Sequence, residues 1–231
     1  MKRSSLLGGL TLVGVGAALI SVVVSGENLF YVRANMTLPL LLAGGFMVLL
    51  GLAAMTGVVP SGHVPFSALG VVVPICFLLL VRPGPLTVDT GLTFDGYGRE
   101  PIRNSVVIPG SAVVGVDAPA DRIAQHAVTI DPSQFLYAAE QFGDRFERVA
   151  VRMIGQVDHS DPDESRLVRF RIMCCAADAT RVSVRLAGTV DADNGEWVEL
   201  TGQWDGDVDD PGFQVISVKV IDQPANPYLS T

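Results

Sequence analysis

The sequence has few of the residue types that carry most catalysis. Its 231 residues include three histidines and three cysteines. It contains no G-x-S-x-G, no H-E-x-x-H, no phosphate-binding P-loop and no G-x-G-x-x-G after a predicted strand. These absences exclude the common signatures of serine hydrolases, zinc peptidases and nucleotide-binding enzymes. We therefore predict that the chain is not an enzyme.

Basic charge is also scarce in most of the chain. Residues 86–231 carry 23 acidic and 12 basic side chains, whereas residues 1–85 carry one acidic and four basic ones. An acidic surface repels phosphate backbones, and no basic stripe offsets that repulsion. The charge balance therefore argues against nucleic acid as a partner.

Charged residues are missing from three apolar stretches in the first third of the chain. Residues 6–24 and 37–59 are each long enough to cross a membrane core, which takes about 20 helical residues. Residues 64–81 form a third candidate, although Pro65 and Pro74 interrupt it. A proline in a lipid-embedded helix is tolerated when neighbouring helices satisfy the freed backbone groups. The composition therefore predicts three membrane spans, with two as the alternative.

The number of spans decides on which side of the membrane the rest of the chain lies. We predict a transmembrane anchor over residues 1–82, in contact with the lipid of the cell membrane. Lys2, Arg3 and the terminal amine favour a cytoplasmic start, so three crossings leave the C-terminal part outside the cytoplasm. Two crossings would leave it inside. A cleaved signal peptide is disfavoured, because the first apolar run is longer than the apolar region of a usual signal peptide.

The remaining sequence consists mainly of short segments of the β type. Residues 83–105 are rich in proline and glycine and are predicted to be a linker, followed by a β domain over residues 106–231. In residues 166–173 arginines alternate with apolar side chains, which is typical of a strand with one buried face. Strands are predicted at residues 111–116, 148–159, 166–175, 181–188, 196–204 and 213–221.

One helix and one tight turn are predicted inside this β domain. Residues 131–142 have apolar side chains at helical spacing, with Asp131 or Ser133 as the cap and Gly143 as the stop. Asn194-Gly195 tolerates positive φ at both positions, which is typical of the turn in a β-hairpin.

Two similar segments indicate the kind of β domain. "VRMIGQVD" at 151–158 and "VELTGQWD" at 198–205 each place a glycine in the middle of a strand. Small closed barrels need such glycines where a strand bends sharply. The predicted fold is therefore a helical membrane anchor followed by a mainly β domain, an OB-like small barrel with one helix.

The order of several motifs resembles the YcgQ-like family of permease subunits. These motifs are "SGENLFYVRANMTLPLLLAG", "PGPL", "GQV", "RFRIMCCAADA", "EWVELTGQW" and "NPYL". The resemblance implies a membrane anchor fused to a β-rich domain that works beside a larger multi-span permease subunit. It also implies three spans and an extracytoplasmic β domain.

The adjacent pair Cys174 and Cys175 leaves three interpretations open: apolar packing, contact with a metal or cargo, and redox chemistry. Neighbours on a strand point to opposite faces, so joint ligation needs a bulge or the end of the strand, which "AADAT" at 176–180 could supply. A zinc site would need further ligands, for which Asp178, His126 and His159 are the candidates. No other cofactor is expected.

Two further features have weaker functional interpretations. Trp197 and Trp204 are candidates for stacking on a ligand, although core packing is favoured for at least one of them. The acidic run at 205–212 lacks the glycine and the glutamate of a calcium loop and is predicted to be a charged turn.

These observations give three hypotheses about function. The first is an accessory subunit of a permease, whose extracytoplasmic OB-like domain gates the permease or presents cargo. The second is a self-contained metal or thiol-redox sensor built on "CCAADA". The third is an envelope module that binds glycans or lipids.

Overall fold

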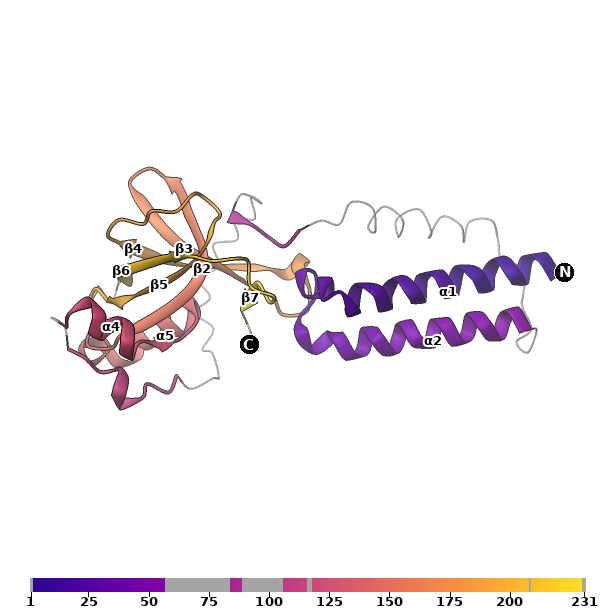
Figure 1. Ribbon diagram of the computed structural model, residues 1–231, viewed down its shortest axis with the longest axis horizontal. Helices are drawn as coiled ribbons and strands as arrows, with labels where there is room; N and C mark the ends of the chain where they lie inside the picture. The colour runs from indigo at the N-terminus through magenta and orange to yellow at the C-terminus, as the bar shows by residue number, and fades with distance from the viewer. Residues whose placement is uncertain (1, 57–83, 89–105, 116–117, 208, 230–231) are drawn as a thin grey trace. The chain divides into compact units, whose positions relative to one another are not determined.

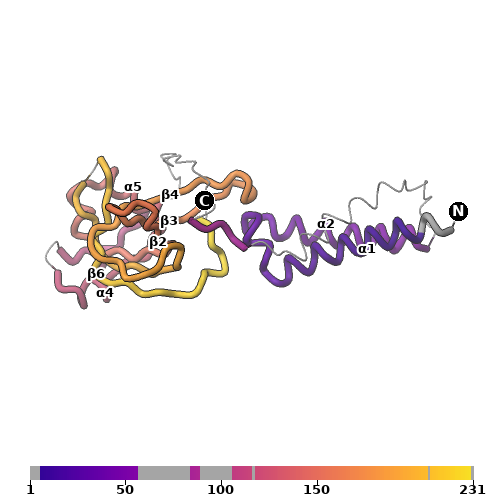
Figure 2. The backbone as a smooth tube through the Cα atoms, turned by 90° about the horizontal axis from the view of Figure 1, so that it is seen from above, coloured from indigo at the N-terminus to yellow at the C-terminus, as the bar shows by residue number. Residues whose placement is uncertain are grey.

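The structure is a computed structural model, shown in Figures 1 and 2, that describes residues 2–56, 84–88, 106–115, 118–207 and 209–229. The predicted third span and most of the predicted linker lie outside these residues. The chain divides into two compact units. The first contains residues 1–85 and the tripeptide 174–176, and the second contains residues 86–173 and 177–231.

The first unit is built on two apolar helices, α1 (Lys2–Val24) and α2 (Thr37–Thr56). Two short 3-10 turns connect them, η1 (Glu27–Phe30) and η2 (Ala34–Met36). Both helices are long and apolar enough to cross a membrane, over Leu6–Val24 and Ala34–Thr56. Figure 1 shows them side by side. The chain therefore has two N-terminal helices that could span a membrane, as predicted.

Glycines let these two helices approach closely. A Cβ added to Gly16 would lie 2.5 Å from the carbonyl oxygen of Gly44, and one added to Gly51 would lie 2.7 Å from that of Gly9. Because residue 9 faces residue 51 and residue 16 faces residue 44, the helices are antiparallel. Small residues at a helix interface allow this kind of backbone contact in membranes.

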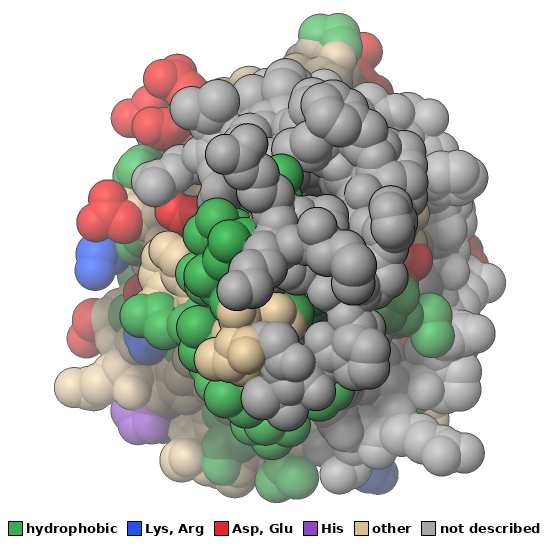
Figure 3. Space-filling model, turned by 90° about the vertical axis from the view of Figure 1, so that its right-hand side faces the viewer, with side chains coloured by type: hydrophobic (Ala, Val, Ile, Leu, Met, Phe, Trp, Pro, Cys, Tyr) green, Lys and Arg blue, Asp and Glu red, His purple; other side chains and the backbone are tan. Residues whose placement is uncertain are grey.

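The outward faces of the helix pair are apolar. Leu7, Leu38, Leu42 and Leu49 are each more than half exposed. Hydrophobic side chains gather on the helix pair where it faces the viewer in Figure 3. Such a surface suits lipid or further helices and not water.

The second unit is a closed β-barrel. Its seven strands are β1 (Val128–Thr129), β2 (Val151–Asp161), β3 (Glu164–Arg171), β4 (Thr180–Ala187), β5 (Trp197–Trp204), β6 (Gly212–Val220) and β7 (Tyr228–Leu229). Five of them form the ring β2–β3–β4–β6–β5, which closes by the pairing of β5 with β2. All pairs in the ring are antiparallel except β4–β6. This mainly β domain is consistent with the predicted OB-like barrel.

Both predicted glycine bends are present in the barrel. Gly155 lies where β2 passes from pairing with β5 to pairing with β3, and an added Cβ would lie 2.8 Å from the Val168 carbonyl oxygen. Gly202 lies at the β-bulge between β5 and β6, and its added Cβ would collide with the Gln214 carbonyl oxygen. Only glycine fits these close approaches of two backbones.

The predicted helix is α5 (Pro132–Phe142). It lies beside the barrel, as does a shorter helix, α4 (Ala120–His126). Asp131 caps α5 by accepting from the Gln134 backbone N–H at 2.9 Å, and the Gln134 side chain accepts from the Asp131 N–H in return. Gly143 ends the helix. Phe135 packs against Phe146 and Phe213 with ring centroids 5.5 and 5.6 Å apart, which attaches α5 to the barrel core.

Two local predictions about strands were wrong. Of the strand predicted at residues 111–116, the described part, 111–115, forms no strand: Gly110–Ala112 is a 3-10 turn, and Val113 makes a single bridge to Val149. The predicted strand at 166–175 ends at Arg171, before the cysteines. In both places apolar content predicted a strand, but among the described residues each segment forms only one isolated bridge and a few backbone hydrogen bonds, which is too short a pairing for a strand.

The predicted hairpin at Asn194-Gly195 was also wrong, although the turn exists. Gly195 has φ +82°, as the turn requires. However, β4 and β5 do not pair with each other, because each pairs with β6. The turn is bound to β2 instead: the Gly195 N–H donates to the Val157 carbonyl at 2.7 Å, and the Asn194 side chain accepts from the His159 N–H at 2.8 Å.

Residues 86–88 are attached to the barrel. The Val88 N–H donates to the buried Gln156 side chain at 3.1 Å, and the Leu86 N–H donates to the Tyr228 hydroxyl at 3.3 Å. Val88 is 8% exposed and packs in a small apolar cluster with Val168 and its neighbours. Leu86–Val88 is therefore part of the β unit.

Candidate functional site

The cysteine pair lies in an irregular loop between β3 and β4, residues 172–179, called here the cysteine loop. Strand β3 ends at Arg171, and Ala176–Asp178 forms one 3-10 turn. The Asp178 carboxylate accepts the Met173 N–H at 2.7 Å, which closes the loop on itself. Because the cysteines lie outside any strand, the alternation that would separate their side chains does not apply.

Within the cysteine loop, the two thiols lie on the same side. Cys174 Sγ and Cys175 Sγ are 3.7 Å apart, in hydrogen-bond contact. One Asp178 carboxylate oxygen and both sulfurs all lie within 4.8 Å of one another. Cys174 is exposed, whereas Cys175 and Asp178 are half-buried. The exposure of Cys174 argues against simple apolar packing for that residue.

The tip of the cysteine loop pairs with the connection between α1 and α2. Cys175 forms an antiparallel bridge with Val32. The Arg33 N–H donates to the Cys174 carbonyl at 3.2 Å, and the Ala176 N–H donates to the Tyr31 carbonyl at 2.7 Å. This pairing could not be predicted from the sequence, because backbone hydrogen bonds between distant segments do not require particular residue types.

Neither histidine predicted as a metal ligand belongs to this three-residue group. His126 is exposed at the end of α4, where its Nδ1 contacts the Arg122 carbonyl at 3.0 Å. Both ring nitrogens of His159 are engaged, Nδ1 with Ser165 Oγ at 2.8 Å and Nε2 with the Ala192 carbonyl at 3.0 Å. The His159 ring thus serves to fix the loop before β5.

The two candidates for ligand stacking, Trp197 and Trp204, are both buried, so the core packing that the sequence favours for at least one of them applies to both. Trp197 is 8% exposed and Trp204 is 3% exposed. The Trp204 indole N–H donates to the Asp207 carbonyl at 3.1 Å, and its ring lies in the barrel core. The Arg169 guanidinium lies 5.8 Å from the centre of the Trp197 ring. Both positions belong to β5, whose side chains are mostly buried.

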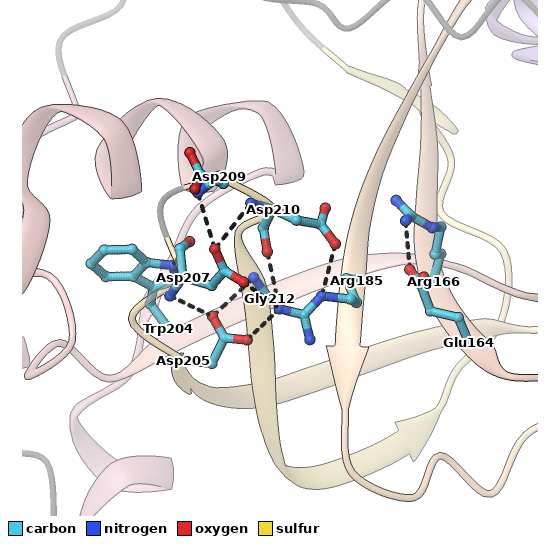
Figure 4. Close-up of polar contacts among 9 residues, drawn as sticks. All are labelled: Glu164, Arg166, Arg185, Trp204, Asp205, Asp207, Asp209, Asp210 and Gly212. Carbon is cyan, nitrogen blue, oxygen red and sulfur yellow. Dashed lines mark hydrogen bonds and ion pairs between the residues drawn. The ribbon is translucent and has the colours of Figure 1, made fainter.

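The acidic run at 205–212 is organised around an arginine that the sequence did not point to. Figure 4 shows Arg185 of β4 contacting Asp205 at 2.7 Å and Asp210 at 2.9 Å, with Asp207 at 3.6 Å. Burial alone would lower the pKa of Arg185, but Asp205 and Asp210 outweigh it and raise that pKa. The run is a charged turn, as predicted. Its carboxylates form ion pairs with the Arg185 guanidinium.

The protein belongs to the class in which an OB-like barrel domain follows a pair of apolar helices that could cross a membrane. Residues 119–230, which include the whole barrel ring, match the DUF1980 C-terminal domain. The match does not extend to the helix pair. No curated protein and no solved structure matches the chain.

Proposed function

We propose that the protein is a membrane-anchored accessory subunit of a larger multi-span permease, with its barrel outside the cytoplasm. It is a non-enzymatic subunit that presents cargo to the permease or gates it. The observation that supports this best is the pair of apolar helices, α1 and α2, that could cross a membrane ahead of the barrel domain. The DUF1980 match and the resemblance of the motifs to permease subunits are consistent with it.

The proposed location requires an odd number of membrane crossings, because Lys2 and Arg3 favour a cytoplasmic start. Two crossings, by α1 and α2, would return the chain to the cytoplasm. The proposal therefore includes the third span predicted at residues 64–81.

A labelling experiment tests the orientation. Cys76 is replaced by serine in the full chain, so that Cys174 and Cys175 are the remaining thiols. With Lys2 and Arg3 in the cytoplasm, a membrane-impermeant thiol reagent added to intact cells labels the protein. A control with a single cysteine at Ser4, and with all three native cysteines replaced, is labelled only after the cells are opened. Labelling of the native pair from the cytoplasmic side alone would overturn the orientation.

A capture experiment tests the role as a subunit. The full chain is purified from its native membrane in mild detergent and analysed for proteins that copurify in stoichiometric amount. The proposal expects one multi-span partner whose loss abolishes transport in the same way as loss of this chain. Consistent purification of the chain alone, with transport unaffected by its deletion, would contradict the proposal.

A self-contained thiol-redox or metal sensor is the second candidate. The 3.7 Å separation of the two sulfurs supports it, and it requires no permease. The capture experiment therefore separates the two candidates. The third hypothesis, an envelope module for glycans or lipids, loses its main support because both tryptophan rings are buried.

A further inference from the structure

We infer that Cys174, Cys175 and Asp178 form a three-ligand site for a thiophilic divalent metal ion of the zinc type. The fourth position on the metal is left open for a partner or for water. The metal-binding site is inferred from the geometry alone. We further infer that the bound ion is the cargo of the permease, and this second step rests on the function proposed above. Each part of the inference comes from the geometry of the cysteine loop.

The separation of the sulfurs fits a shared metal ion. Zinc–sulfur bonds are about 2.3 Å long, so two thiolates at a tetrahedral angle on one ion lie about 3.8 Å apart. The observed separation of Cys174 Sγ and Cys175 Sγ is 3.7 Å. A disulfide would need about 2.05 Å. The loop therefore holds the two sulfurs at the separation of metal ligands and well beyond that of a covalent bond.

Asp178 is positioned as the third ligand. Its Oδ1 accepts the Met173 N–H at 2.7 Å, which fixes the orientation of the carboxylate. The carboxylate lies within 4.8 Å of both sulfurs, and a tetrahedral site with zinc–oxygen bonds of about 2.1 Å needs about 3.6 Å. The carboxylate and the sulfurs therefore draw closer together when the ion binds. A backbone hydrogen bond to a ligating carboxylate is a common way to orient it.

The donor set selects the class of ion. Two thiolates favour zinc and similar ions, whereas calcium and magnesium prefer oxygen alone. Structural zinc sites are closed by four protein ligands, but a site with three protein ligands keeps a position open for exchange. Cys174 is exposed, so an ion can enter and leave. The net negative charge of residues 86–231 attracts cations to this domain.

The test uses the full chain in mild detergent, with Cys76 replaced by serine, fully reduced and freed of metal by chelation. Cobalt(II) is titrated as the spectroscopic probe, and zinc is then added in competition. The expected result is one equivalent of cobalt with a sulfur-to-cobalt charge-transfer band, which zinc removes. Cys174→Ser and Cys175→Ser each remove the band.

Asp178→Asn weakens cobalt binding by roughly 10- to 100-fold while its amide oxygen still accepts the Met173 N–H. The matched control is Asp144→Asn, an exposed acidic residue outside the cysteine loop, which leaves affinity unchanged. Thermal unfolding of each variant checks that it is folded.

Two results would overturn the site: a folded, reduced chain without a charge-transfer band, or cobalt binding that survives replacement of both cysteines. Metal binding without a permease partner in the capture experiment would defeat the proposed function alone. A captured permease with no metal binding would defeat the metal site alone.

Discussion

Arg181 of β4 donates a charge-assisted hydrogen bond to Asp158 of β2, reaching past the intervening strand β3. Asp158 is 5% exposed, and its carboxylate also accepts from the Ser160 N–H at 2.9 Å and the Ser160 hydroxyl at 2.6 Å. Burial alone would raise the pKa of Asp158, but the Ser160 hydrogen bonds and Arg181 outweigh it and lower that pKa. This interaction links β2 to β4 across β3.

The lowered pKa of Asp158 predicts a defined pH dependence of stability. The folded pKa lies below the unfolded value of about 3.9, so the stabilisation is complete above that pH and is lost as the pH falls through the folded pKa. Asp158→Asn should cost about 2 kcal/mol at pH 7 and progressively less below about pH 4. Thermal unfolding of the full chain in detergent across this range measures the difference. A difference that stays constant with pH would contradict the assignment.

Arg185 should stabilise the parallel seam of the barrel. Strands β4 and β6 pair over only three residues, and Arg185 joins β4 to Asp205 and Asp210, which flank the turn before β6. Because Arg185 is 24% exposed, we expect Arg185→Gln to cost about 1 kcal/mol of unfolding free energy.

Arg166→Gln is the matched control for Arg185. Figure 4 shows Arg166 paired with Glu164 of the same strand, at 2.6 Å. Because both residues lie in β3, this ion pair does not connect one strand to another. Its loss should change the free energy of unfolding by less than about 0.5 kcal/mol. Equal effects of the two substitutions would show that the seam does not depend on Arg185.

Gly51 should be required for the contact between α1 and α2. A Cβ at this position would lie 2.7 Å from the Gly9 carbonyl oxygen, so Gly51→Val forces the helices apart at a cost of about 1–3 kcal/mol. Gly45→Val is the control, because an added Cβ there meets nothing within 4 Å. Thermal stability of the purified chain in detergent distinguishes them. An equal loss in both variants would contradict the packing.

Arg33→Pro should release the cysteine loop from the connection between the helices. Arg33 has φ −62° and ψ 146°, which proline adopts without strain, so proline removes the guanidinium and the backbone N–H that donates to the Cys174 carbonyl. We expect Cys174 and Cys175 to react faster with a thiol reagent in this variant. Arg33→Ala keeps the N–H and should react like the original chain. Faster reaction in both variants would assign the effect to the side chain.

Local sequence signals predicted the elements whose causes are local. Helix α5 begins after Asp131 and ends at Gly143, as expected. Gly155 and Gly202 lie at the two bends of the barrel strands. A cap or a close approach of two backbones demands a particular residue type, so these positions are visible in the sequence.

Features that depend on which strands become neighbours could not be predicted in this way. Asn194-Gly195 has the chemistry of a hairpin turn, but the chain order around the barrel separates β4 from β5. Likewise, nothing in the spacing of Arg185 and Asp205 shows that they meet. The cysteine pair combines both cases: its residue types and a strand end near it were visible in the sequence, but the end was expected at residues 176–180, whereas β3 ends at Arg171, before the cysteines.

The attachment of Leu86–Val88 to the barrel extends the β unit beyond the residues that match the DUF1980 C-terminal domain. A chain cut to residues 119–230 lacks the Val88 N–H that donates to Gln156 and the Leu86 N–H that donates to Tyr228. It also lacks Val88, which packs in the apolar cluster with Val168. The barrel on its own should therefore be produced from residue 86 onward.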